Sequence, residues 1–408
     1  MIHNMIYKES YYPWVIASMS MFIVTISNGL INSGLTVFDE SLLNEFGWKI
    51  SELKLRDSIT FLGTSVLVLG AGWLVDRIGF KLLLMFGMLL LSICYYSYSY
   101  VDSLSDIYLL HVGFTLVACS AGNLTAIVAS ANWVKKRKGL AIGMAIAGTS
   151  VGGILIPPMA NYLNQNYGWR TSMQIEAIIP LVMFVLIFLF VRNKTKNSVE
   201  VENDPELMKG ISFNKVIKSP IFYLIACSAA CTYFAILALF SHIFLYMRSL
   251  NYEPQTSALA ISTLALAALA GKILSGYLSD SVDTYKLFKA QMAMMLIGLL
   301  GISFLPIAIW LFLLVAGFCW GSLHTLYNYI LITLFGLKDA GKINGAISLV
   351  EAIGGGLGIY LVGYIYDTFD GYSDAWLCVV VVMSIGVILS WSVKVSDRDQ
   401  AQLVTNKR

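Results

Sequence analysis

The chain has 408 residues, of which 58% are hydrophobic and only 12% charged; the formal net charge is +3 and the mean hydropathy is +0.74. Soluble domains carry about 25% charged residues, so this composition excludes a water-soluble globular protein and predicts an all-α membrane protein. The six cysteines lie inside apolar segments without metal-ligand spacing, so we expect no disulfide framework and no metal site. The start, MIHNMIYKESYYPWV, lacks the pattern of a signal peptide, and we expect it to be retained.

Apolar segments of spanning length recur along the whole chain. A transmembrane helix needs about 20 mainly apolar residues. The spans predicted in chain order are 14–38, 53–75, 82–101, 107–133, 139–162, 170–191, 219–247, 255–279, 286–305, 308–335, 342–366 and 374–393. The stretch between the sixth and seventh spans is charged and polar, as is typical of a solvated linker. We therefore predict 12 transmembrane helices in two pseudo-symmetric six-helix bundles, residues 1–192 and 219–408, joined by a cytoplasmic linker at 193–218.

The positions of the basic residues predict the orientation. With the N-terminus inside, 21 of the 27 Lys and Arg residues fall on the cytoplasmic side, including the cluster KKRK at 135–138. Five fall outside: Lys49, Lys54, Arg56, Arg170 and Arg248. This asymmetry satisfies the positive-inside rule and predicts that both termini are cytoplasmic, in the plasma (inner) membrane. A juxtamembrane cluster such as KKRK favours topology or lipid contact over nucleic-acid binding.

The two halves of the sequence repeat a glycine pattern. GLAIGMAIAGTSVGGIL at 139–155 aligns with GKINGAISLVEAIGGGL at 341–357, at an offset of 202 residues. GWLVDRIGFK from Gly72 aligns with GYLSDSVDTYK from Gly276, at an offset of 204. Glycines four apart allow close helix contact, and their duplication indicates two bundles of the same orientation, a repeat found in transporters whose site lies between the halves.

The stretch GWLVDRIGFK resembles a known family signature. Its pattern, GxxxDRxGxK, is similar to the loop between the second and third helices of the major facilitator superfamily, and the second copy, at Gly276 and Asp280, is degraded. The resemblance implies the superfamily fold over the whole chain. It also implies that this motif is a latch that affects conformational exchange. The residues of the predicted latch are Gly72, Asp76, Arg77, Gly79, Lys81 and Asp280.

A narrower resemblance runs through both halves. EFGWKISEL, NWVKKRKGLAIGMAIAGTSVGG, NYGWRTSM, SHIFLYM and GKILSGYLSD are similar to segments of the monocarboxylate porters and of the oxalate/formate antiporters. In those relatives the eighth helix carries a cation that binds the substrate carboxylate, which implies this role for Lys272. The resemblance therefore implies a small organic anion, of monocarboxylate type, as the substrate.

The sequence departs from these relatives at several positions. Oxalate exchangers place a second cation in helix eleven, where this chain has Glu351, which argues against a dicarboxylate. The helix-one lysine of animal monocarboxylate porters is also absent. Helix four lacks the arginine, and helix five the Gly-Pro pattern, of proton-linked drug exporters, so drug efflux is less favoured.

Lys272 and Glu351 are predicted at equal depth, roughly 12–14 Å from the cytoplasmic edge at 1.5 Å per residue. Intramembrane charges commonly pair, so a fixed Lys–Glu pair holding the C-terminal half together is one interpretation. The other is proton coupling: protonation of Glu351 frees Lys272 to bind a carboxylate, and one proton travels with one anion. A Lys and a Glu together also suit a zwitterion.

Polar residues elsewhere at membrane depth are weaker candidates for substrate contact: Asn28, Asn32, Asn123, His324 and Tyr327. Each side chain can hydrogen-bond a substrate, although each is individually favoured as an interhelical contact. His242 suits an interfacial role, and Glu176 in helix six has no evident partner.

Other classes of function fit the sequence less well. The segments outside the predicted spans carry no GxSxG, HExxH or phosphate-loop motif, so we expect no enzyme and no cofactor. A sensor built on a transporter fold remains an alternative, as does an anion exchanger. We expect a monomer that contacts membrane lipid, a small organic anion and protons.

Overall fold

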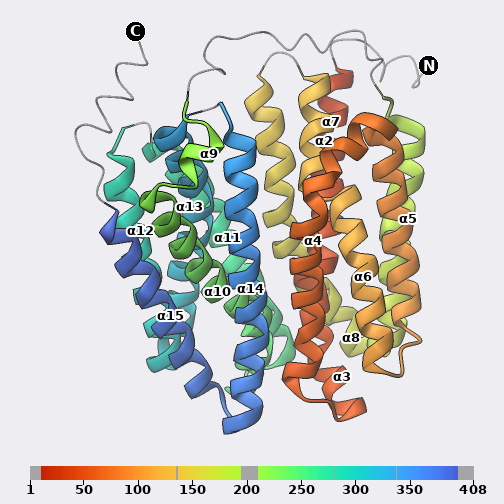
Figure 1. The fold of residues 1–408 in the computed structure, drawn as a ribbon. Helices are drawn as coiled ribbons and strands as arrows, with labels where there is room; N and C mark the ends of the chain where they lie inside the picture. Colours follow the sequence, from red (N-terminus) through yellow and green to blue (C-terminus); the bar gives the residue numbers. More distant parts are fainter. Residues whose placement is uncertain (1–10, 135–136, 194–209, 280, 337, 394–408) are drawn as a thin grey trace. The chain divides into compact units, whose positions relative to one another are not determined.

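The computed structural model describes residues 11–134, 137–193, 210–279, 281–336 and 338–393, apart from the side chains of Leu69 and Asp76. This part is helical and contains no strand beyond one isolated bridge between Gly210 and Gly336. The helices, shown in Figure 1, are α2 (Tyr12–Asn28), the π-helix η1 (Gly29–Gly34), the 3-10 helix η2 (Leu35–Phe38), α3 (Asp39–Phe46), α4 (Ile50–Ile78), α5 (Phe80–Tyr98), α6 (Leu104–Ala121), α7 (Asn123–Trp133), α8 (Lys138–Phe190), α9 (Phe213–Val216), α10 (Pro220–Ser249), α11 (Pro254–Ser279), α12 (Thr284–Phe304), η3 (Pro306–Ala308), α13 (Ile309–Phe335), α14 (Ala340–Phe369) and α15 (Tyr372–Ser392).

The long helices correspond to the predicted spans. Ten helical stretches of the described residues are long and apolar enough to cross a membrane. One of them, α8, has 53 residues and contains two predicted spans, because Gly168 at φ +74° kinks it in the middle. The 29-residue α4 is not among the ten and covers the predicted span 53–75. Together with the second span within α8 and with α4, these ten stretches make up the 12 expected spans. The all-α fold is therefore confirmed.

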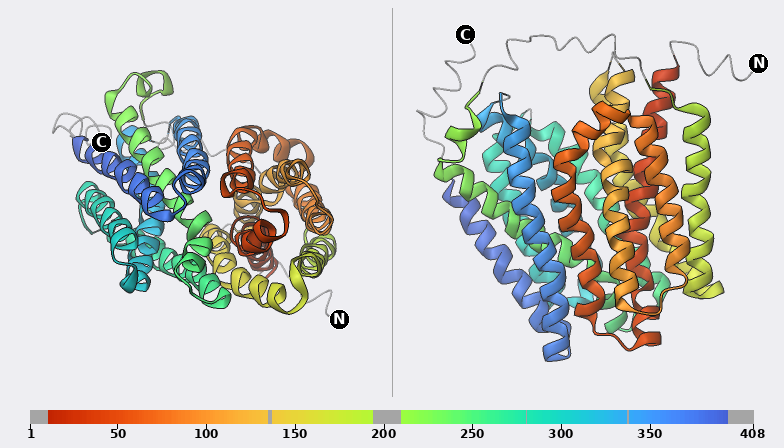
Figure 2. Two further views of the ribbon diagram at one scale, coloured as in Figure 1. Left: turned by 90° about the horizontal axis from the view of Figure 1, so that it is seen from below. Right: turned by 45° about the vertical axis from the view of Figure 1, so that its right-hand side comes forward.

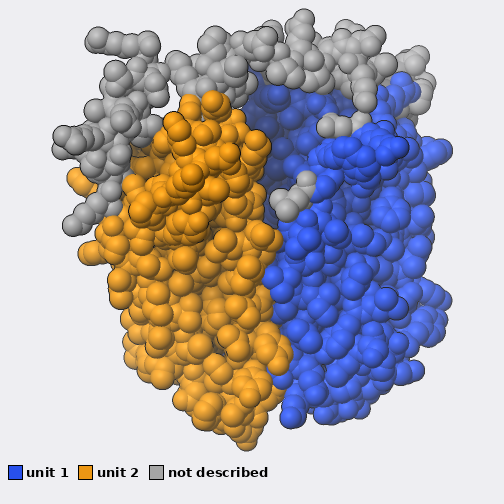
Figure 3. Space-filling model, in the orientation of Figure 1, with its two compact units in different colours: residues 1–196, 240–266 blue, residues 197–239, 267–408 orange. Residues whose placement is uncertain are grey.

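The chain forms two compact units (Figure 3). Unit 1 comprises residues 1–196 and 240–266, and unit 2 comprises residues 197–239 and 267–408. Unit 1 therefore holds α2 to α8 together with the last turns of α10 and the first half of α11. The predicted boundary of the two bundles within the linker at 193–218 stays a prediction.

In unit 1 the first predicted span changes its helical form along its length. The α-helix α2 passes into the π-helix η1 and then into the 3-10 helix η2. Its face lies close against α8: a Cβ at Gly29 would come within 3.0 Å of the Gly152 Cα and 2.5 Å of Ile156 Cγ1. Only glycine fits this approach. α4, α5 and α6 run alongside one another in the same unit (Figures 1 and 2).

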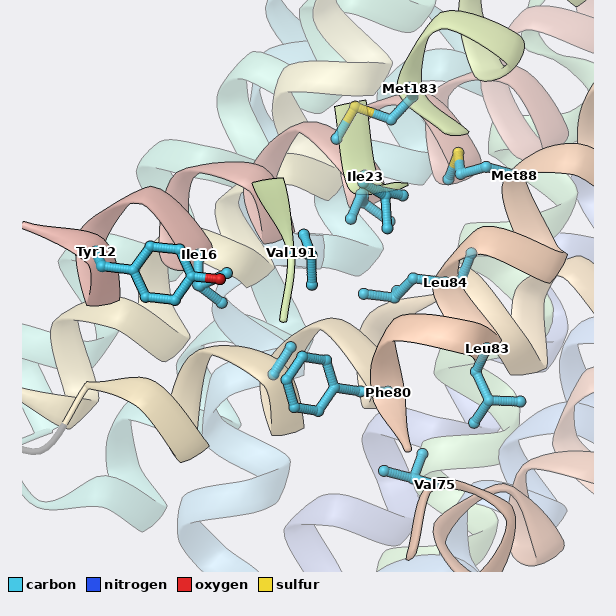
Figure 4. Packing of buried hydrophobic residues seen from close by; sticks show 13 residues of the cluster. Tyr12, Ile16, Ile23, Val75, Phe80, Leu83, Leu84, Met88, Met183 and Val191 are labelled. Atoms are coloured by element: carbon cyan, nitrogen blue, oxygen red, sulfur yellow. The ribbon is translucent and has the colours of Figure 1, made fainter. Parts of the chain in front are cut away.

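A hydrophobic cluster holds one end of unit 1 together (Figure 4). Side chains of α2, α4, α5, α7 and α8 meet in it, among them Ile23, Leu84 and Met183, and these three are 0–3% exposed. Met88 of α5 and Val191, which follows α8, also belong to the cluster and are labelled in Figure 4. The cluster includes Val75 near the end of α4 and Phe80 at the start of α5, so it fixes both helices that the loop motif connects.

Unit 2 repeats the glycine packing of unit 1. A Cβ at Gly354 of α14 would come within 2.8 Å of the Ala230 backbone on α10, and one at Gly358 within 2.9 Å of the Phe234 backbone. Gly152 and Gly354, which align in the sequence repeat, thus have the same role: each lets the fifth helix of its half approach the first. α12 packs beside α13 and α15 in this unit.

Candidate functional site

The three asparagines predicted as candidates lie together in unit 1. The Asn32 Nδ2 donates to Asn28 Oδ1 at 3.2 Å, and the Asn28 Nδ2 donates to Asn123 Oδ1 at 3.4 Å. Asn32 and Asn123 are exposed, and Asn28 is half-buried. The relay leaves the amide NH2 of Asn123 as a donor toward an oxygen of a ligand.

Irregular backbone on two helices builds this asparagine relay. Asn32 lies in the π-helix η1, whose Leu30 carbonyl accepts a hydrogen bond from the Tyr95 hydroxyl at 2.8 Å. Asn123 begins α7 because Gly122, at φ −88° and ψ −165°, breaks the predicted span 107–133 into α6 and α7. π-Helical turns recur at functional sites, and the half-helices of transporters point their positive N-terminal ends at anionic groups. The break at Gly122 was not predicted, because hydropathy carries no information about backbone torsion angles.

Lys272 lies half-buried on α11 in unit 2. It is near enough to His324 on α13 for the two side chains to interact electrostatically. The helices carrying them approach closely, since a Cβ at Gly271 would come within 2.9 Å of the Phe318 carbonyl carbon. The Ser275 hydroxyl also donates to Ser322 Oγ at 2.7 Å. Lys272 and His324, which were predicted as separate candidates, therefore lie near each other.

Glu351 lies half-buried on α14 in the same unit. Its carboxylate accepts a hydrogen bond from Ser348 and lies near the hydroxyls of Tyr233 and Tyr327. Glu351 therefore lies beside hydroxyl groups of both α10 and α13.

Tyr327 is buried and firmly anchored, unlike the exposed His324 three residues before it. Its hydroxyl lies 3.1 Å from both Ser228 Oγ and Thr232 Oγ1 of α10. Its ring meets that of Phe288 edge to face, with 5.0 Å between centroids. This geometry favours the interhelical role over substrate contact.

The latch motif connects α4 to α5 and is fixed to the end of α8. Gly79 has φ +88°, which favours glycine, and a Cβ there would meet the Asn193 side chain at 2.6 Å. The Lys81 backbone N–H donates to Asn193 Oδ1 at 3.0 Å, and its ammonium donates to the Phe188 carbonyl at 2.9 Å. The Arg77 guanidinium lies over the Trp73 ring, 5.2 Å from its centroid. Gly72 faces open space, whereas Asp280 and the Asp76 side chain lie outside the described residues.

The sequence missed a buried group of charges that we call the charge tetrad: Asp39, Lys54, Arg56 and Asp57. Lys54 and Arg56 had been assigned to the outer edge of a span, yet both side chains are 0% exposed. The available signal was the close spacing of opposite charges in ELKLRD at the start of a span. His242, expected in an interfacial role, is also fully buried, and so is Glu176, whose two carboxylate oxygens have no hydrogen-bond partner within the described residues.

Comparison with known proteins places these features in context. The sequence profile of the Major Facilitator Superfamily matches residues 17–359. Monocarboxylate transporter 13 of Rattus norvegicus is 22% identical over 92% of this chain and 88% of that protein. The oxalate:formate antiporter of Oxalobacter formigenes is 22% identical over 79% of this chain and 77% of that protein. The crystal structure of a bacterial homologue of the human lysosomal transporter Spinster is similar with a TM-score of 0.76, at 15% identity, over 96% of this chain and 97% of that one.

Proposed function

Because the chain belongs to the major facilitator superfamily, as its loop motif predicted, we propose that it moves a small organic monocarboxylate across the membrane by alternating access. The family makes it an integral, multi-pass membrane transporter rather than an enzyme. The monocarboxylate, the coupling to protons, the cytoplasmic termini, the plasma (inner) membrane and the monomeric state are parts of the proposal. The names of two relatives, a monocarboxylate transporter and an oxalate:formate antiporter, support an organic anion.

Lys272 is the observation that carries the proposal. A cation within a transmembrane helix is costly and commonly marks a substrate or ion pathway. Lys272 is half-buried with His324 nearby, so its ammonium can be reached by an incoming carboxylate. Partial burial strengthens that contact, because opposite charges attract each other more strongly in a low dielectric than in water.

Glu351 is our candidate for the coupling proton. A half-buried carboxyl beside hydroxyl groups can bind and release a proton as its surroundings change. When Glu351 is ionised its charge opposes an incoming anion, and when it is protonated that opposition disappears. One proton then accompanies one monoanion.

The asparagine relay supplies neutral donors in unit 1. Asn28 and Asn32 orient the Asn123 side chain through their two hydrogen bonds. The NH2 of Asn123, at the positive end of α7, suits a carboxylate or hydroxyl oxygen. We propose that the relay sets substrate orientation, while Lys272 supplies the charge.

Uptake into proteoliposomes tests the proposal. We expect radiolabelled lactate to accumulate when the pH is lower outside, with competition by pyruvate and little by oxalate. Lys272→Gln should abolish accumulation, whereas the matched control Lys342→Gln, at an exposed residue paired with Asp339, should not. Glu351→Gln should uncouple uptake from the pH gradient; a variant that keeps full pH-driven accumulation would sink the proton role.

The rival functions give different results in the same assay. Accumulation of a radiolabelled amino acid, in the absence of lactate accumulation, would favour a zwitterion. Uptake only into vesicles preloaded with a second anion would indicate an exchanger. Binding without flux would indicate a sensor, and extrusion of apolar cations would indicate drug efflux.

A further inference from the structure

We propose that the turn between α12 and α13, residues 304–308, is inserted among the acyl chains of the leaflet farther from the linker, whereas the α14–α15 turn of the same unit reaches water. Both turns lie at one end of unit 2, because α12 and α14 each start at the opposite end. That opposite end is the linker side, where the Phe213 backbone N–H of α9 donates to Asp339, just before α14, at 2.9 Å. Figure 1 shows α9 and the α14–α15 turn at opposite ends of unit 2.

The α12–α13 turn exposes apolar side chains and carries no charge. Ile307 is 94% exposed, and Phe304 and Leu305 before it are exposed as well. Residues 290–337, which include the turn, contain no Asp, Glu, Lys or Arg. Exposed apolar patches rarely face water unless they bind something, so this tip requires an apolar partner.

The α14–α15 turn has the opposite chemistry. Asp370, which ends α14, and Asp374, in the first turn of α15, are both exposed. Acidic side chains are costly in hydrocarbon, so they mark this turn as one that reaches the headgroups or water. The same end of unit 2 therefore carries two turns of different polarity.

The lengths of the two helices agree with this difference. Leu305 follows the exposed Lys286, near the start of α12, by 19 residues, or about 29 Å of helix. Asp370 follows the exposed Lys342, near the start of α14, by 28 residues, or about 42 Å. The hydrocarbon core is about 30 Å thick. With both lysines at the linker-side surface, α12 ends at the far edge of the hydrocarbon, whereas α14 passes beyond it.

The backbone of the α12–α13 turn is suited to an apolar environment, in which N–H groups must bond within the protein. The Leu305 N–H donates to the Gly301 carbonyl at 2.9 Å, and the Ala308 N–H donates to the Leu305 carbonyl at 3.0 Å. Pro306 has no N–H, and the Ile309 N–H donates to the Pro306 carbonyl. None of these four positions needs water as an acceptor.

The two helices pack too closely for the apolar side chains of the turn to fold between them. A Cβ at Gly301 of α12 would lie 2.1 Å from the Phe312 ring of α13, and one at Gly298 would lie 3.2 Å from the Ala316 backbone nitrogen. The tip is therefore covered from outside the hairpin. Acyl chains are the partner that fits, because the tip lies at their depth and offers no charge to pair with a protein.

Fluorescence quenching in vesicles tests the insertion. The environment-sensitive dye NBD is attached at Ile307→Cys in the full-length chain, with its native cysteines replaced, and the protein is reconstituted into phosphatidylcholine vesicles. The matched control is Ser373→Cys, because Ser373 is exposed at the same end of unit 2 and shares any mixture of orientations. We expect lipid with a doxyl group near the glycerol to quench the dye at Ile307→Cys several-fold more than at Ser373→Cys. Aqueous iodide should show the reverse order.

A third label position calibrates the depth. Ile297, on α12 and 57% exposed, lies ten residues before Ile307, so Ile297→Cys should respond more to a doxyl group near the end of the acyl chain. Equal iodide quenching at Ile307→Cys and Ser373→Cys would place the turn in water and overturn the proposal. Quenching of Ile307→Cys by neither agent would also overturn it, because protein, such as a second copy of the chain, would then cover the turn. The measurement uses no substrate, so it stands or fails independently of monocarboxylate uptake.

Discussion

Unit 1 holds four charged side chains in contact with one another, three of them 0% exposed and Asp57 15% exposed, whereas Lys272 and Glu351 of unit 2 are half-buried. Charges of the first kind satisfy one another and need no ligand. Charges of the second kind stay accessible to something that arrives and leaves. The comparison teaches that accessibility, rather than the mere presence of a charge within the helices, singles out a candidate for a transport site.

The strongest way to break this comparison is to remove one member of the charge tetrad. Asp39→Leu leaves two buried cations, Lys54 and Arg56, with Asp57 as their single anion in the tetrad, and breaking a buried pair costs about 3–5 kcal/mol. We expect a large drop in the melting temperature of the detergent-solubilised protein, or no folded protein. Replacing all four charges with apolar residues of similar volume should recover most of the loss. An Asp39→Leu protein as stable as the wild type would show that the tetrad is not a paired structural group.

The opposite result is expected at Lys272. Losing a hydrogen bond to a charged group costs about 1.5–3 kcal/mol, which corresponds to roughly a tenfold to hundredfold loss of substrate affinity. Lys272→Gln should show this loss in equilibrium binding, with an unchanged or raised melting temperature. Lys272→Arg should keep binding, because the charge remains. If Lys272→Gln instead unfolds the protein, its role is structural, like that of the tetrad.

Local composition explains the part of the fold that the sequence predicted. Hydropathy located the spans, because each depends only on its own run of apolar residues. The repeat of Gly152 at Gly354 indicated equivalent helices, and both glycines do face a neighbouring backbone. Gly79 was predicted from the loop motif, and the turn after α4 has a positive φ there.

The rest depends on tertiary contacts that no short stretch encodes. The π-helix η1 and the break at Gly122 bring Asn32 and Asn123 to one relay, although hydropathy predicts two uninterrupted spans. Lys54 and Arg56 lie at the end of a span in the sequence, and only the fold reveals that Asp39 buries them. Which way Lys272 and Glu351 face cannot be predicted from their depth, because helix rotation is set by packing.

The glycine repeat tests whether the two units share their packing although they differ in their charges. Adding a Cβ at Gly152 or Gly354 forces two helices apart, and overpacking costs about 1–3 kcal/mol. Gly152→Ala and Gly354→Ala should therefore lower the melting temperature by similar amounts. Gly139 and Gly341 provide matched controls, because they align in the same repeat and a Cβ there meets nothing within 4 Å. Equal losses at all four positions would refute the packing role.

Glu176 is the exception that sharpens the comparison, since unit 1 also holds one buried carboxyl that is not paired. It is 0% exposed and its two oxygens have no hydrogen-bond partner within the described residues. A carboxyl in such surroundings is expected to be neutral, because burying an unpaired charge costs far more than binding a proton. Glu176→Met removes an unsatisfied polar group, so we expect about 1 kcal/mol of added stability and a slightly higher melting temperature. Lactate uptake should keep its dependence on pH if Glu351 carries the proton. Loss of that dependence in Glu176→Met, with Glu351→Gln still coupled, would move the proton site to unit 1 and make Glu176 the functional charge.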